Sequence, residues 1–93
     1  MKLDKQNRIR IPTDLLVATK LSGKRNLRIF VMDGKNLMIF DGNDFPKQEF
    51  HGTVLLDAKG RFNLKSYIIP LLDCPCQEYV VSVKEHFIFI RWM

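Results

Sequence analysis

The stretch LDKQNRIRIPTDLL at residues 3–16 decides the fold, because the chain repeats it as LDAKGRFNLKSYII at residues 56–69. The two copies align without a gap, so that Asp4 matches Asp57 and Arg8 matches Arg61. Self-similarity of this kind is typical of a repeated supersecondary unit. The sequence therefore predicts two similar units, residues 1–41 and 55–93, which a connector at 42–54 joins and which together form one domain.

Each repeat contains the same order of local signals. A short strand ending in Leu-Asp precedes a polar turn, in which Asn7 and Gly60 occupy equivalent places. Both residues tolerate the left-handed backbone conformation that tight turns demand. An alternating strand follows, with Arg8 and Arg10 on one face and apolar residues on the other.

A helix is expected next. Pro12 suits the first turn of a helix, which should run to about Leu21 and stop at Gly23. Core packing is the default for its apolar residues, although Leu16 and Val17 lie partly outside the apolar stripe. In the second repeat Pro70 falls within the matching segment, so that helix should be shorter or kinked.

A hairpin closes each unit. Residues 28–32 and 37–40 flank an Asp-Gly turn, and residues 78–83 and 87–92 flank a second turn. The alignment matches Leu37 and Ile39 with Phe87 and Phe89. Both closing strands are apolar on both faces, which predicts burial on both sides, in a barrel centre or a subunit contact. In the connector, Phe45 and Phe50 should pack back onto the body.

Charge is distributed unevenly along the 93 residues. Residues 1–46 hold nine Lys and Arg against five acidic residues, whereas residues 47–93 hold six against five, and the net charge is +5. A basic half indicates a polyanionic partner, most often nucleic acid. The alternative is an ordinary soluble surface, because a net charge of +5 is common in small domains.

Several classes of function find no support in the sequence. The apolar runs are too short to span a bilayer and no signal peptide is recognisable, so a cytoplasmic protein without membrane contact is expected. Cys74 and Cys76 are too few for a zinc site, and a free thiol pair is the expected reading. Neither a nucleophile motif nor a glycine-rich phosphate loop occurs. We therefore expect neither an enzyme, a metal nor a cofactor.

The repeat resembles the AbrB-like swapped-hairpin family, which includes the AbrB and SpoVT regulators, MazE-type antitoxins and MraZ. The residues that carry the resemblance are 3–12 and 56–64, each with an Asp-x-x-x-Arg turn. Two such units in one chain make the MraZ type the closest likeness. The resemblance implies an all-β fold with one short helix per repeat, in which two swapped-hairpin units form a small barrel of the double-split or double-psi kind.

The resemblance also implies a DNA-binding transcriptional regulator that contacts double-stranded DNA through its basic N-terminal unit and assembles as a homo-oligomer. On that analogy Arg8 and Arg61 are the motif arginines, although Arg8 pairing with Asp4 across the turn is an equally good structural role. The candidate DNA-binding residues are Lys5, Arg8, Arg10, Lys24, Arg25, Arg28, Lys59 and Arg61.

One departure from the family pattern leaves a second function open. Where the family's helix carries arginines, this chain has Leu16 and Val17, and the second repeat has Ile69 and Pro70. Positive charge is thereby lost from the expected DNA face. The alternative is a protein-binding module of the same fold, antitoxin-like or scaffolding, that uses its apolar helices and closing strands.

Overall fold

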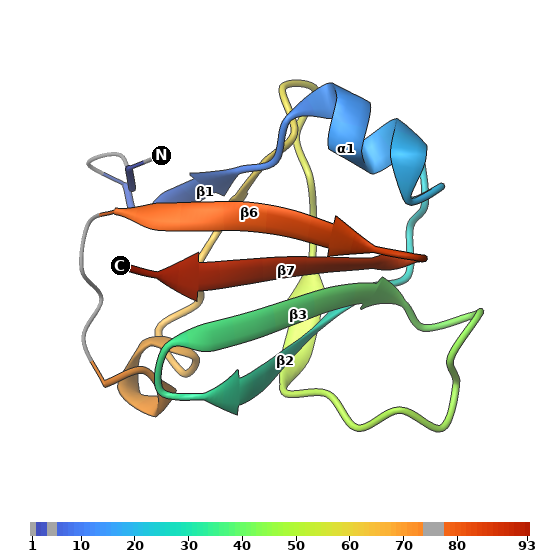
Figure 1. Cartoon of the computed structure of the whole chain (residues 1–93). Helices are drawn as coiled ribbons and strands as arrows, with labels where there is room; N and C mark the ends of the chain where they lie inside the picture. Colours follow the sequence, from blue (N-terminus) through green and yellow to red (C-terminus); the bar gives the residue numbers. More distant parts are fainter. Residues whose placement is uncertain (1, 4–5, 74–77) are drawn as a thin grey trace.

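The computed structural model describes residues 2–3, 6–73 and 78–93, and within them the fold is mostly β with one short α-helix (Figure 1). The strands form two antiparallel sheets, one of two strands in the order β1-β5 and one of five in the order β4-β2-β3-β7-β6. The expected β fold is confirmed, whereas no closed barrel is formed by the strands that the structure describes.

The elements follow the expected order only in part, because no strand precedes β1 among the described residues and β4 ends at Val54 rather than at Leu56-Asp57. They are β1 (Arg8–Arg10), α1 (Thr13–Ala18), β2 (Leu27–Asp33), β3 (Asn36–Asp41), β4 (Gly52–Val54), β5 (Arg61–Asn63), the 3₁₀ turn η1 (Ile69–Leu71), β6 (Tyr79–Lys84) and β7 (Phe87–Trp92).

Strands from the two repeats pair directly with each other. Ile9 of β1 lies opposite Phe62 of β5. Just beyond this pair the contacts are reciprocal: the Ile11 N–H donates to the Gly60 carbonyl at 2.9 Å, and the Leu64 N–H donates to the Asn7 carbonyl at 3.1 Å. The residue that follows the strand of each repeat is therefore hydrogen-bonded to the turn of the other repeat.

The two turns adopt the backbone conformation that the sequence predicts. Asn7 has φ of 57° and Gly60 has φ of 76°. At Gly60 a side chain is also excluded by space, because a Cβ there would lie 2.6 Å from the carbonyl oxygen of Ile11. The close approach between the second turn and the end of β1 thus depends on glycine.

A β-bulge in the first hairpin changes which residues of the two closing strands, β3 and β7, are equivalent. The register of β2 against β3 shifts between Val31 and Asp33, so the first hairpin holds one extra residue. The fully buried residues of β3 and β7 in the core cluster are Leu37, Ile39, Ile88 and Ile90. The alignment of Leu37 and Ile39 with Phe87 and Phe89 was therefore wrong by one residue.

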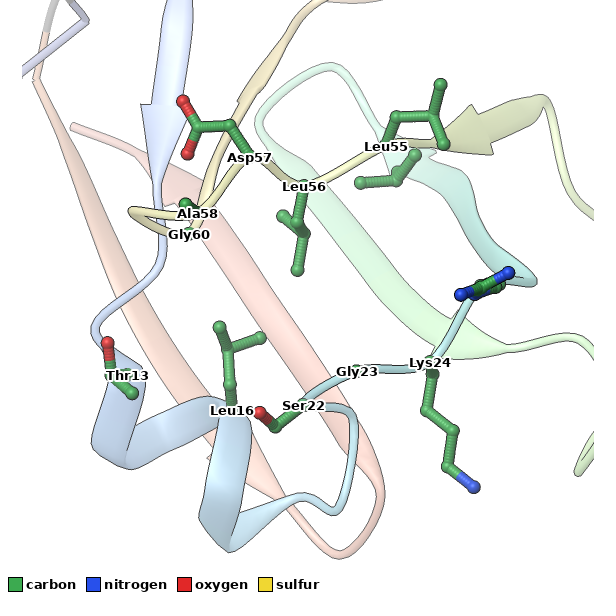
Figure 2. A pocket seen from close by; sticks show the side chains of 12 residues that line it. Thr13, Leu16, Ser22, Gly23, Lys24, Leu55, Leu56, Asp57, Ala58 and Gly60 are labelled. Atoms are coloured by element: carbon green, nitrogen blue, oxygen red, sulfur yellow. The ribbon is translucent and has the colours of Figure 1, made fainter.

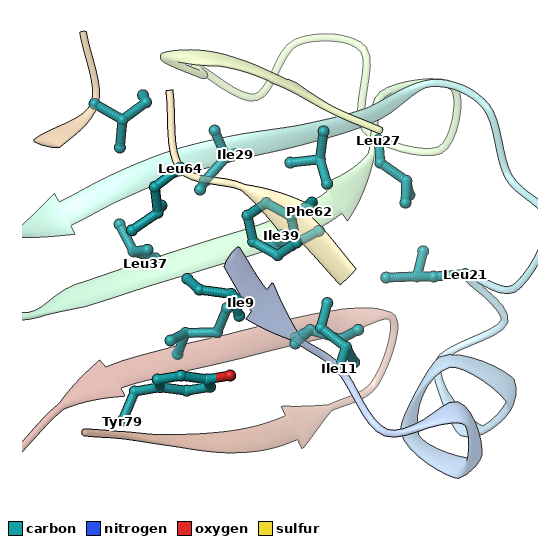
Figure 3. Close-up of a cluster of buried hydrophobic side chains, with 14 of the residues drawn as sticks. Ile9, Ile11, Leu21, Leu27, Ile29, Leu37, Ile39, Phe62, Leu64 and Tyr79 are labelled. Atoms are coloured by element: carbon teal, nitrogen blue, oxygen red, sulfur yellow. The ribbon is translucent and has the colours of Figure 1, made fainter. Parts of the chain in front are cut away.

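The core lies between the five-stranded sheet and the β1–β5 pair (Figure 3). Ile9 of β1 and Phe62 of β5 belong to this cluster together with Ile39 of β3. The cluster draws on both repeats and also contains Tyr79 and Trp92, whose rings meet edge to face at 5.5 Å. One shared core therefore holds both repeats together.

The outer face of the five-stranded sheet is covered only in part. Phe45 of the connector packs against Phe40 and Phe87, with ring centroids 6.4 and 4.6 Å away, as the sequence predicts. Residues 37–41 of β3 are consequently buried on both faces. In β7 residues 87 and 89 are only half-buried within the chain, so this strand is not the centre of a barrel, and its expected role in a subunit contact stays a prediction.

Helix α1 is shorter than expected. It ends at Ala18 rather than near Leu21, because Lys20 takes a left-handed φ of 60°. The Lys20 N–H bonds to Val17 and the Leu21 N–H to Leu16, which is the pattern of a Schellman C-cap. Leu16 is buried and only Val17 is exposed, so α1 does not present both residues to a partner.

The second repeat forms only the 3₁₀ turn η1 around Pro70, as a proline inside the segment predicts, and not the expected α-helix. Across the residues that the structure describes, no helix is long and apolar enough to cross a membrane.

Residues 1–46 expressed alone should not fold. Without β5 and β7, the fragment exposes Ile9, Leu37 and Ile39, which are fully buried in the whole chain. A core of fewer than fifty residues is too small to replace those contacts. We expect a spectrum of unfolded or aggregated chain by circular dichroism, and a monomeric fragment with a cooperative thermal transition would contradict shared folding.

Gly60→Ala should lower the free energy of unfolding by about 2 kcal/mol or more, because a left-handed φ is strained for alanine and the Cβ meets the Ile11 carbonyl. Asn7→Gly is the matched control at the equivalent turn and should change stability by less than about 1 kcal/mol. Urea unfolding measures both. Equal effects of the two variants would argue against the close approach at Gly60.

Candidate nucleic-acid interface

The β1–β5 pair gathers arginines from both repeats onto one face. Ile9 and Phe62 are buried, so their neighbours along each strand point away from the core. Arg10 lies directly opposite Arg61, and Arg8 lies opposite Asn63. We call this face, formed by Arg8, Arg10, Arg61 and Asn63, the arginine ribbon.

Arg61 is held in place by the turn that precedes it. Its Nε donates to Oδ2 of Asp57 at 2.8 Å, and the backbone N–H groups of Lys59 and Arg61 donate to Oδ1. The Arg61 backbone N–H is the largest cause of a pKa of Asp57 below its ordinary value of 3.8, with the Lys59 N–H and the Arg61 guanidinium adding to it. The Asp-x-x-x-Arg motif of the second repeat therefore shapes its own turn.

Arg10 differs from Arg61 in having an available guanidinium. Its side chain is exposed and has no hydrogen bond or ion pair with any residue in the described parts of the chain. Its backbone N–H donates to the hydroxyl of Tyr79 at 2.9 Å. Tyr79 is buried, so the strand beneath the ribbon is anchored to the five-stranded sheet while the charged group stays in solvent.

Lys24 and Arg25 line a groove of about 560 Å³ beside the ribbon (Figure 2). One wall is α1 and the loop at 22–25, and the other is the segment from Val54 to Gly60. Leu16, Leu55 and Leu56 form its apolar part. The groove opens where pairing of β2 with β4 stops, at Leu27 and Val54.

The structure separates the remaining candidates. Lys59 lies exposed in the turn next to Arg61. Arg28 lies on the outer face of β2, where its guanidinium stacks 4.2 Å from the ring of Phe50. It points away from the core and the ribbon, so the structure does not bring Arg28 together with the other basic residues, and its contact with DNA stays a prediction. Lys5 lies outside the described residues.

Cys74 and Cys76, and Asp4 as a partner of Arg8, lie outside the described residues. Among the residues that the structure does describe, no group of three or more metal-binding side chains occurs. Asp33 lies at the turn of the first hairpin, where its carboxylate accepts hydrogen bonds. The donors are the Lys35 backbone N–H and the Asn36 side-chain amide, and both lower the pKa of the Asp33 carboxyl.

Sequence reasoning missed two residues. Tyr79 anchors the backbone of Arg10, yet the two residues are 69 positions apart and no pattern in the sequence links them. Leu55 is 78% exposed on the wall of the groove, although it precedes a Leu-Asp strand end that looked like core.

No family model, curated protein sequence or solved structure matches the chain.

The hydrogen bonds at Asp57 predict a pH-dependent stability. Because its pKa is lowered on folding, the ionised carboxylate stabilises the fold above about pH 4, and this contribution is lost as the pH falls through the folded pKa. Asp57→Asn should therefore unfold at lower urea than the wild type at pH 6, and the difference should shrink toward pH 2. A difference in stability between the variant and the wild type that does not change with pH would refute this role. The pKa of Asp33 is lowered in both proteins, so its contribution cancels when they are compared.

Proposed function

We propose that this chain is a DNA-binding regulator related to the AbrB-like swapped-hairpin family, and that the arginine ribbon is its contact with duplex DNA. The observation that carries the proposal is the register of β1 with β5, which puts Arg8, Arg10 and Arg61 of two different repeats on one solvent-facing surface.

The reciprocal strand pairing supports the family relationship. Each repeat contributes one strand to the two-stranded sheet, and each turn accepts the backbone N–H that follows the other repeat's strand. This exchange is what a swapped-hairpin arrangement of two units in one chain requires.

The electrostatics of the ribbon favour a polyanion. Like charges directly opposite each other on paired strands destabilise a sheet, and Arg10 faces Arg61. Asp57 offsets the charge of Arg61, but no described residue offsets that of Arg10. A phosphate backbone would supply the missing negative charge, and phosphate contacts provide most of the affinity of DNA-binding proteins.

The shape of the ribbon suits duplex DNA. The major groove admits a two-stranded antiparallel ribbon, and an arginine on such a ribbon can reach the N7 and O6 atoms of guanine. In this proposal Arg10 reaches toward the bases, since its guanidinium is available. Arg61 and Lys59 contact phosphate from the adjoining turn.

A second candidate function, protein binding, is favoured by the groove. Leu55 is mostly exposed beside Leu16 and Leu56, and Lys24 and Arg25 flank them without a side-chain partner among the described residues. The surfaces first expected to bind protein are less suitable, because Leu16 and most of β3 are buried. An acidic partner bound here would be lost in Leu55→Asp, whereas DNA binding would persist.

Arg10→Ala should weaken binding to duplex DNA by about 1–3 kcal/mol if Arg10 reads a base, with relaxed sequence preference. Selection on random duplexes identifies the preferred site, and fluorescence anisotropy over a range of salt concentrations then measures affinity. The slope of log affinity against log salt should fall by about 1. Folding should be unaffected or slightly improved, because the variant removes the repulsion with Arg61.

Lys47→Ala is the matched control. It removes the same charge from an exposed position in the connector, away from β1 and β5. It should leave affinity nearly unchanged. Equal losses in the two variants would mean that net charge alone drives binding, and no enrichment of any duplex by the wild type would leave the protein-binding candidate as the better one.

A further inference from the structure

The outer edge of β6 lies at the end of the five-stranded sheet, whereas the outer edge of β2, the equivalent strand of the first repeat, is paired with β4. In the first repeat β4 pairs with the outer edge of β2 at Leu27, Arg28 and Ile29. In the second repeat the equivalent contact is a single bridge between Lys2 and Glu78, at the very start of β6. Beyond that bridge, the edge of β6 pairs with no strand in the described parts of the chain.

The open edge presents main-chain groups of two residues. The Met93 N–H donates to the Glu78 carbonyl, so Glu78 faces β7. In an antiparallel ladder alternate residues face the same neighbour. Ser82 and Lys84 therefore also face β7, whereas Val81 and Val83 direct their N–H and C=O groups to the open edge.

The side chains of this edge are unprotected. Val80 is 49% exposed and Val83 is 38% exposed. The stretch Tyr79–Val83 contains no charge, glycine or proline. Uncharged edge strands rich in β-branched residues are prone to pair with another strand.

We propose that the open edge of β6 pairs with the same edge of a second copy of this chain, in an antiparallel arrangement centred on Ser82. Val81 then lies opposite Val83 of the partner subunit, and the two-fold relation repeats this pair. Four main-chain hydrogen bonds form, and the five-stranded sheets of two copies become continuous.

The two ends of the strand restrict the register. A pairing centred on Val81 would bring a second strand against Glu78, where Lys2 already lies. A pairing centred on Val83 would run into the left-handed turn at Glu85, which has φ of 56°.

The Ser82 register also places no two like charges directly opposite each other, which favours a second copy as the occupant. Lys84 lies opposite an uncharged position, Val80 of the partner subunit, where its aliphatic stem covers apolar surface. The open stretch is therefore complementary to itself.

Sedimentation velocity over a range of protein concentrations tests the proposal on the full chain. The wild type should form a dimer, and Val83→Lys should raise its dissociation constant at least about tenfold, because an edge lysine opposes strand pairing. Val17→Lys makes the same change at an exposed position of α1 and should leave the constant within about twofold. Near-ultraviolet circular dichroism of the single, buried Trp92 reports whether each variant is folded.

Hydrogen exchange distinguishes edge pairing from other modes of association. In the dimer the amides of Val81 and Val83 should become protected as concentration rises, while those of Val80 and Ser82 are protected at every concentration. A wild type that stays monomeric at 100 µM would overturn the proposal. So would a dimer that survives folded Val83→Lys or leaves the Val81 amide unprotected. Each of these outcomes is independent of DNA binding.

Discussion

The reciprocal hydrogen bonds between strand ends and turns are the constraint on which the rest of the structure depends. The Ile11 N–H reaches Gly60, and the Leu64 N–H reaches Asn7. Strands of three residues are too short to be stable as an isolated pair, so these bonds and the burial of Ile9 and Phe62 hold β1 and β5 together. Once those apolar side chains point inward, the alternation of a strand directs the neighbouring arginines outward.

The buried apolar side chains and the arginines of the proposed DNA contact thus lie on opposite faces of the same two strands. The inner face joins a core shared by both repeats. The outer face gathers arginines, of which Arg61 is held by the carboxylate of Asp57. The hydroxyl of the buried Tyr79 accepts a hydrogen bond from the backbone N–H of Arg10. The backbone of β1 is thereby fixed without the Arg10 side chain.

The two repeats differ where new surfaces appear. Lys2 forms an isolated bridge with Glu78, but the equivalent residues Leu55 and Asn26 form no bridge, and the groove opens there. Conversely, β4 covers the outer edge of β2 while β6 stays open. The groove and the open edge therefore both lie at places where the two repeats differ in strand pairing.

The sequence by itself determined the local conformations. The left-handed turns at Asn7 and Gly60, the first hairpin and the alternation of β1 all follow from residue types that act within a few positions. The tertiary structure alone decided which strands meet, that Arg28 points away from the ribbon, and how the closing strands align. The physical reason is that alternation tells which side chains share a face but not what that face packs against. A single bulged residue, here at Met32, moves every later residue by one position without an evident signal in the sequence.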